Sequence, residues 1–263
     1  MGNAVRRFVL GAGLLGRGVG ICLRNPRLFG LGILPALIAG LLYAVALTVL
    51  ILFLADLAAA LTWFADDWSA VWRDTMRVFA GLAILGVAGL VSVLTFTAVT
   101  LLIGDPFYEK ISERVEDRFG GVPGGAVEIV WWRSLGRSLA DSVRLIGLSL
   151  LIGVPLLAIG LIPVAGQVLG TVLGGAVGGW VLALELTGVP FQRRGLRLAD
   201  RRAVFRKNRA MALGFGVAVF ASFLIPLGAV LLMPAAVAGA ALLARKALGQ
   251  PIDIVTVRAA ELG

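Results

Sequence analysis

The sequence predicts an all-α integral membrane protein. We expect a single membrane domain over residues 1–263, with two long transmembrane helices, two helical hairpins that dip into or span the bilayer, and interfacial amphipathic helices. Segments 28–54 and 78–103 each run about 26 positions without a charged residue. Such a helix is about 39 Å long, enough to cross a hydrocarbon core of about 30 Å. The composition agrees, with 59% apolar residues and a mean hydropathy of +0.98.

The basic residues predict the orientation of the chain, because Lys and Arg accumulate on the cytoplasmic side of membrane proteins. The connector 55–77 carries two Arg beside four Asp, whereas 104–144 carries six basic residues and 191–210 carries eight. Five Arg precede residue 28, and the tail 245–263 adds three basic residues. We therefore expect both termini and both basic segments in the cytoplasm, with the connector outside.

Two later apolar segments, 145–190 and 211–244, each begin and end on the predicted cytoplasmic side. Pro163 and Gly166 break the first hairpin, and Pro226 breaks the second. The first arm of the second hairpin has only 15 residues, or about 22 Å of helix, which is shorter than the hydrocarbon core. We expect this hairpin to dip in and return, whereas the first has arms long enough to span.

The segment 104–144 is predicted to form amphipathic helices on the cytoplasmic surface. Asp105 followed by Pro106 is typical of an N-cap and the first residue of a new helix. Apolar residues then recur every four positions and define one face: Phe107, Ile111, Val115 and Phe119. Charged residues, Glu116 among them, are predicted for the other faces. A second amphipathic helix is expected over about 126–144.

Three polar residues are candidates for binding an anion. Gln167 lies at the tip of the first hairpin, where its amide either binds an anion's oxygens or satisfies the carbonyls of the turn. Arg24 and Arg27 stand beside the start of the first span. Their guanidinium groups either hold an oxyanion together with the helix N-terminus or anchor the helix through lipid phosphate.

Glycines recur every four residues after the first hairpin break, at Gly166, Gly170, Gly174 and Gly178. On a helix this spacing forms a smooth stripe that lets another helix approach closely. The stripe predicts helix packing, either as ordinary membrane-protein packing or as the wall of a narrow pore.

Several functions are excluded by what the sequence lacks. It has no His and one Cys, and no recognisable catalytic motif, so we expect no enzyme, no metal site and no cofactor. The net charge of +9 fits cytoplasmic loops better than nucleic-acid binding. Anionic lipids are the expected partners of the basic segments.

A series of short motifs, in order and at matching spacing, points to a known family. They are Pro26 with Ile33-Leu34-Pro35, Pro106-Phe107-Tyr108-Glu109, Ile162-Pro163-Val164-Ala165-Gly166-Gln167, Val189-Pro190-Phe191, and Ile225-Pro226-Leu227 with Met233-Pro234-Ala235-Ala236-Val237-Ala238-Gly239-Ala240. Over about residues 15–245 the chain resembles the CysZ-type sulfate transporters and the wider etoposide-induced membrane protein family. The resemblance implies two spanning helices, two partly penetrating hairpins, homo-oligomers, and sulfate uptake for cysteine synthesis across the bacterial plasma membrane.

The chain departs from this family where the anion is expected to bind. The stretch before the first span typically reads Pro-Gly-Leu-Arg-Arg in the sulfate transporters. With Pro26 and Pro35 aligned, Arg27 takes the glycine position, and Phe29 and Gly30 take the arginine positions.

Two hypotheses follow. In the first, Arg27 captures a small oxyanion with help from Arg24, while Gln167 and the break at Pro163 line or gate the path. In the second, the protein is a non-transporting scaffold or envelope-assembly factor that binds lipids or partners through its basic cytoplasmic face.

Overall fold

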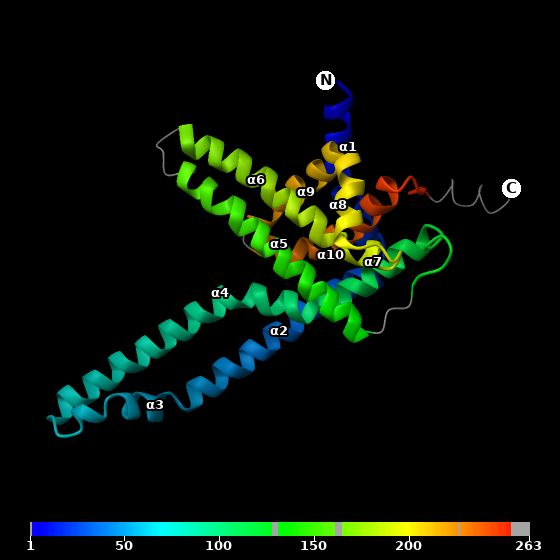
Figure 1. Cartoon of the computed structure of the whole chain (residues 1–263). Helices are drawn as coiled ribbons and strands as arrows, with labels where there is room; N and C mark the ends of the chain where they lie inside the picture. Colours follow the sequence, from blue (N-terminus) through cyan, green and yellow to red (C-terminus); the bar gives the residue numbers. More distant parts are fainter. Residues whose placement is uncertain (1, 128–130, 161–164, 226, 254–263) are drawn as a thin grey trace. The chain divides into compact units, whose positions relative to one another are not determined.

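The computed structural model describes residues 2–127, 131–160, 165–225 and 227–253, and within these ranges the regular structure is entirely helical (Figure 1). Four of the described helices are long and apolar enough to cross a membrane: α2 (Pro26–Leu52), α4 (Ala70–Arg118), α6 (Ala165–Leu186) and α10 (Gly228–Ala247). The predicted fold class is confirmed.

The chain forms two compact units. The two-helix unit covers Ile33–Asp105, and the core unit covers Met1–Gly32 with Pro106–Gly263. In the two-helix unit, α2 and α4 run side by side in opposite directions (Figure 1). Their connection contains α3 (Leu54–Leu61) and the short 3₁₀ helix η1 (Trp63–Ala65), so the predicted connector 55–77 is itself largely helical.

Few polar contacts hold the two-helix unit together. The hydroxyl groups of Tyr43 and Thr95 share a hydrogen bond of 2.6 Å between their oxygens, and the Tyr43 ring lies 5.8 Å from that of Phe96. Only 11% of the most apolar window of α2 is buried within the protein. So large an exposed apolar surface requires lipid around it, which fits the two predicted spans.

Two predicted helix boundaries are wrong. No helix begins at Asp105, because α4 continues through Pro106 for a total of 49 residues. A proline removes one intrahelical hydrogen bond and can kink a helix, but it does not have to end it, and the exposed Pro106 lies inside α4. The amphipathic helix expected over 126–144 is likewise continuous with the first arm of the first hairpin, as α5 (Trp131–Gly160).

The basic segment 191–210 is also more ordered than a loop. It contains the end of α7 (Gly188–Gln192), all of α8 (Leu198–Lys207) and the start of α9 (Arg209–Phe223). The second hairpin is therefore formed by α9 and α10. Its break at Pro226 and the first hairpin's break at Pro163 lie outside the described residues.

The core unit is built around α10, whose apolar window is 78% buried. α10 packs against α1 (Gly2–Arg24) on one side and against α9 on another, and α9 in turn packs against α6. The surface of α10 toward α1 is made of small residues around Ala235 and Gly239. Although α10 has the composition of a membrane span, it is surrounded by protein rather than by lipid.

The helix α1 was not anticipated, although its pattern is visible in the sequence. Its buried positions are Gly11, Leu14, Gly18 and Cys22, which recur every three or four residues and form one face. A side chain at Gly18 would overlap the backbone carbonyl of Ala235 in α10. Gly18 therefore sets how closely α1 approaches α10.

We predict opposite effects for two glycine substitutions in α1. Gly18→Ala places a methyl group on the Ala235 carbonyl and should lower the free energy of unfolding by about 1–3 kcal/mol. Gly20 has open space within 4 Å of an added Cβ, so Gly20→Ala should raise stability by up to about 1 kcal/mol through helix propensity. Thermal unfolding in detergent tests both, and equal shifts would contradict the close approach at Gly18.

Chemical labelling of Cys22, the single thiol of the chain, tests whether α1 is packed against the rest of the core unit. Cys22 is 4% exposed, and burial raises the pKa of its thiol to about 11. At pH 8 only about one thiol in a thousand is then the reactive thiolate, so alkylation by iodoacetamide should be slow and should accelerate as the pH rises toward 11. Denatured protein, with a thiol pKa near 8.5, is the control and should label at once. Rapid labelling of folded protein at pH 8 would show that α1 is not packed.

Candidate functional site

The predicted arginine pair lies at the junction of α1 and α2, where Asn25 is the single residue between the two helices. The Asn25 side-chain nitrogen donates to the Ile21 carbonyl at 2.7 Å, and the Asn25 carbonyl accepts from the Leu28 N–H at 2.9 Å. Pro26 follows as the first residue of α2, where its missing N–H costs nothing. One residue therefore closes α1 and opens α2.

The junction is held against α10 from both sides. Gly18 of α1 contacts Ala235, and a side chain at Gly32 of α2 would overlap the ring of Pro234. Successive residues of α10 thus contact both helices that meet at Asn25. The backbone of the junction therefore has a fixed position in the core unit.

Arg24 and Arg27 are exposed at this junction, and within the described chain neither makes a hydrogen bond or an ion pair. Arg27 lies in the first turn of α2, which contains no acidic residue. Its charge therefore adds to the positive end of the helix dipole rather than neutralising it. A helix N-terminus and two unpaired guanidinium groups together favour binding of an anion.

Gln167 lies elsewhere in the core unit. It is exposed on the first turn of α6, and its backbone carbonyl accepts a 2.8 Å hydrogen bond from Thr171 Oγ1. In Figure 1 the start of α6 and the end of α5 lie apart from the end of α1. The fold therefore does not bring Gln167 and the arginine pair into one site.

The glycine stripe of α6 contacts two different neighbours. An added Cβ at Gly170 would lie 3.3 Å from the Gly160 Cα of α5, and one at Gly178 would meet the ring of Phe220 in α9. Gly174 has open space within 4 Å, and Gly166 is buried in the first turn. The closest approach to α9 lies just beside the stripe, where Gly179 and Gly216 touch through their backbones.

A buried ionic cluster lies at the C-terminal end of α4, and it corrects the predicted position of Glu116. That side chain was expected on a charged face, yet it is 0% exposed. Its two carboxylate oxygens accept from Arg193 at 3.1 Å and Arg194 at 2.5 Å. Arg194 also donates to the carbonyl of Pro190 at 2.6 Å and to the Gln250 side-chain oxygen at 2.7 Å.

Arg245 extends this cluster from the end of α10. Its buried guanidinium donates to the backbone carbonyls of Phe119, Gly121 and Pro251, the last two at 2.6 and 3.0 Å. These bonds join the turn after α4 to α10 and to the chain beyond it. The sequence carries one indication: the eight cations of 191–210 have only Asp200 as an acidic neighbour, which leaves arginines available to pair with an acid from another segment.

Within the described ranges, no group of three or more His, Cys, Asp or Glu side chains is arranged to hold a metal ion. The polar chemistry of the described sites is that of guanidinium groups, helix termini and amides. Such groups bind and release anions and do not themselves act as nucleophiles or general bases at neutral pH.

Comparison with known proteins agrees with the resemblance predicted from the sequence motifs. The family described as "Sulfate transporter CysZ/Etoposide-induced protein 2.4" matches residues 14–234. Among its relatives, the sulfate transporter CysZ of Pseudomonas fluorescens strain Pf-5 is 34% identical over 152 residues, covering 56% of this chain and 60% of the relative.

Two further relatives, also sulfate transporters named CysZ, match to a similar degree. The protein of Vibrio cholerae strain O395 is 30% identical over 158 residues, covering 55% of this chain and 58% of the relative. The protein of Pseudomonas syringae pv. tomato is 32% identical over 151 residues, covering 56% of this chain and 59% of the relative. In each comparison the chain spans about three fifths of the relative's length.

We predict that the carboxylate of Glu116 is required for folding stability. Glu116→Gln keeps the shape but leaves Arg193 and Arg194, which are 18% and 7% exposed, without their counter-charge. The free energy of unfolding should fall by about 3 kcal/mol. Asp117→Asn is the control, because Asp117 is 63% exposed and lies 3.7 Å from Arg193, so its loss should cost less than about 1 kcal/mol. Equal thermal shifts for the two variants would contradict a structural role for the buried cluster.

Proposed function

The chain belongs to the sulfate transporter CysZ/etoposide-induced protein 2.4 family, and on that premise we propose that it moves a small oxyanion, most favourably sulfate, across the bacterial plasma membrane. The family relationship is the basis of the substrate class. In this proposal, the imported sulfate supplies sulfur for cysteine synthesis.

The observation that carries this proposal is the unpaired arginine pair at the junction of α1 and α2. In the proposed mechanism Arg27 and Arg24 capture the anion at the cytoplasmic end of α2. They stand near the family's arginine positions, which Phe29 and Gly30 occupy here. A guanidinium spans several ångströms and binds a tetrahedral oxyanion through two N–H groups, so a shifted pair can serve the same chemistry.

The proposed orientation places both termini and the basic segment 191–210 in the cytoplasm, following the charge pattern. The working form is proposed to be a homo-oligomer in the bilayer. Leu151 and Leu157 of α5 are 73% and 71% exposed, an apolar surface that lipid or a second copy of the chain would cover.

A second candidate is the non-transporting scaffold, and two observations favour it. Gln167 is separate from the arginine pair, and α6 meets α9 through direct backbone contact at Gly179 and Gly216. That contact leaves no room for a polar path between those two helices. In this alternative the cytoplasmic cations bind lipids or a partner, and nothing crosses the membrane.

We predict that purified protein in proteoliposomes takes up radiolabelled sulfate faster than protein-free liposomes. The double variant Arg24→Ala/Arg27→Ala removes both charge-assisted contacts and should lower the rate at subsaturating sulfate at least about tenfold. The matched control is Arg114→Ala/Arg118→Ala, which removes two exposed arginines that have no partner in the described chain. The control variant should transport at the unmodified rate.

Two results would change the proposal. Uptake that survives the Arg24/Arg27 variant would retain transport and move the binding site elsewhere. Uptake no faster than in empty liposomes, from protein whose Cys22 is still protected from labelling, would remove sulfate transport and favour the scaffold.

A further inference from the structure

A third arginine of α1 lies on the same side of the helix as Arg24. Arg17 and Arg24 are seven positions apart in this helix, which corresponds to about 10.5 Å along the axis and only about 20° around it. Both side chains are exposed. A long side chain in a helix leans toward the helix N-terminus, so Arg24 leans toward Arg17. This arrangement makes Arg17 a candidate third cation for the site at the α1–α2 junction.

The surface between these two arginines is open. Gly20 lies between them on α1, and outside its own stretch of helix backbone no atom lies within 4 Å of a Cβ added at that position. A guanidinium at the end of its flexible stem spans several ångströms. Two such groups on one helix face, about two turns apart, therefore reach the oxygens of a single tetrahedral oxyanion held between them.

Arg17 already holds an oxyanion that belongs to the chain itself, the carboxylate of Asp253. Its Nη1 donates to Oδ1 of Asp253 at 3.4 Å. The contact is long, and it uses one of the five N–H donors of the guanidinium. It also lies at the surface, where the two side chains are 53% and 63% exposed, so it contributes little to stability. A doubly charged oxyanion beside Arg24 is therefore able to displace it.

Asp253 reaches α1 because the chain that follows α10 is held in place. The Gln250 N–H donates to the Arg245 carbonyl at 2.8 Å, and the Gln250 side-chain oxygen accepts from Arg194 at 2.7 Å. The next carbonyl, that of Pro251, accepts from Nε of Arg245 at 3.0 Å. The segment before Asp253 is thus anchored to the buried ionic cluster, and it positions the carboxylate against α1 as part of the core unit.

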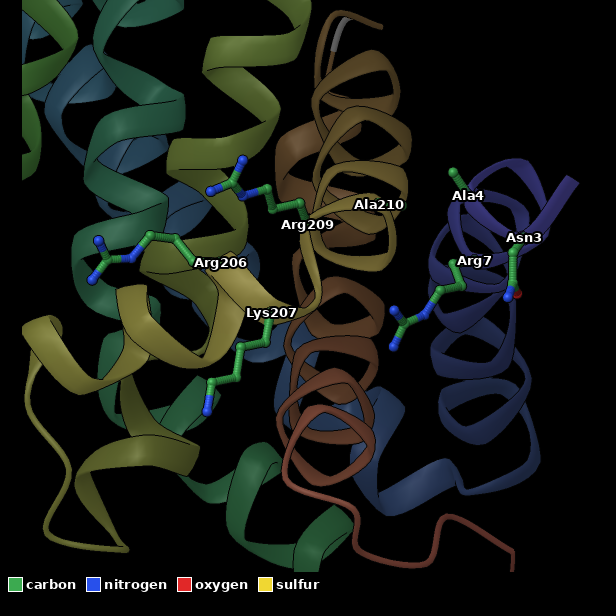
Figure 2. A pocket seen from close by; sticks show the side chains of 7 residues that line it. All are labelled: Asn3, Ala4, Arg7, Arg206, Lys207, Arg209 and Ala210. Carbon is green, nitrogen blue, oxygen red and sulfur yellow. The ribbon is translucent and has the colours of Figure 1, made fainter. Parts of the chain in front are cut away.

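The cations around the beginning of α1 are arranged differently. Arg7 donates to the side-chain oxygen of Asn208 at 2.9 Å. Figure 2 shows that the charged ends of Arg206, Lys207 and Arg209, which line a pocket together with Arg7, extend away from it. These four side chains therefore do not face one ligand. The aligned arginines of α1 are instead those toward the junction.

We propose that Arg17 is a third anion-binding side chain of the α1–α2 junction, and that the Asp253 carboxylate occupies it until a small oxyanion bound by Arg24 takes its place. This inference rests on the proposed function. Asp253 competes with the substrate for one guanidinium and so lowers the affinity of the site. Because the competing carboxylate is held by its own backbone, it returns to Arg17 when the anion leaves.

The test is equilibrium binding of radiolabelled sulfate to the detergent-purified full chain, measured by scintillation proximity. Asp253→Asn removes the competing charge and should tighten sulfate binding about two- to fivefold. Arg17→Gln removes one charge-assisted contact and should weaken binding at least about threefold. In the double variant the carboxylate has lost the arginine through which it acts. Adding Asp253→Asn to Arg17→Gln should therefore change the affinity by less than about 1.5-fold.

The matched control is Asp117→Asn. Asp117 is also an aspartate that is 63% exposed and paired with an arginine of the core unit, in this case Arg193. Its substitution should leave the affinity for sulfate unchanged. Protection of Cys22 from alkylation verifies that each variant is folded.

Three results would overturn this inference and leave the proposed function standing. Equal tightening by Asp253→Asn and Asp117→Asn would mean that total charge, not this ion pair, sets the affinity. Tightening by Asp253→Asn that persists without Arg17 would mean that the carboxylate repels the anion from a distance. Sulfate binding that is lost in Arg24→Ala/Arg27→Ala but unaffected by Asp253→Asn and Arg17→Gln would remove Arg17 from the site. Failure of the unmodified, folded chain to bind sulfate would instead remove the proposed function, and this inference with it.

Discussion

The core unit depends on direct backbone contact between helices. In a membrane, water no longer drives apolar faces together, and helix association relies on close packing instead. Gly18 lets the backbone of α1 contact the Ala235 carbonyl of α10. Gly179 of α6 and Gly216 of α9 likewise let the backbones of these two helices touch. α10 is itself enclosed by protein, and two regions of it hold neighbouring parts of the unit. Its middle, at Pro234 and Ala235, holds the α1–α2 junction, and its C-terminal end carries Arg245 into the buried ionic cluster.

The basic residues of the core unit fall into two groups, although the sequence presents most of them as one basic segment, 191–210. Arg193 and Arg194 form ion pairs with the buried carboxylate of Glu116. The guanidinium of Arg245 donates hydrogen bonds to backbone carbonyls that would otherwise be unpaired. These interactions stabilise the unit and are unavailable to a ligand. Arg206, Lys207 and Arg209 are exposed and make no hydrogen bond or ion pair within the described chain. Charge count alone does not distinguish the two groups, whereas burial and partners do.

The family relationship and the geometry of the arginine pair support transport from different directions. The relationship gives a substrate class, and the α1–α2 junction gives an exposed pair of guanidinium groups at a helix N-terminus. Gln167 lies away from that junction. The structure therefore does not bring together Gln167 and the arginine pair, which the sequence hypothesis had placed on one anion path. If the anion passes through the protein, the residues that line its path beyond Arg24 and Arg27 have to come from elements other than the first turn of α6.

Apolar length, charge distribution and motif order determined the membrane class, the two long apolar helices and the family, because each of these is a local or sequential property of the chain. Tertiary structure decided what those patterns cannot encode. It buried α10 although its composition is that of a span, continued α4 through Pro106, and turned Glu116 inward. It also joined Arg7 to Asn208 across 201 positions and Glu116 to Arg193 across 77. Such pairings depend on which helix faces meet, and that is set by packing over the whole unit rather than by any one segment.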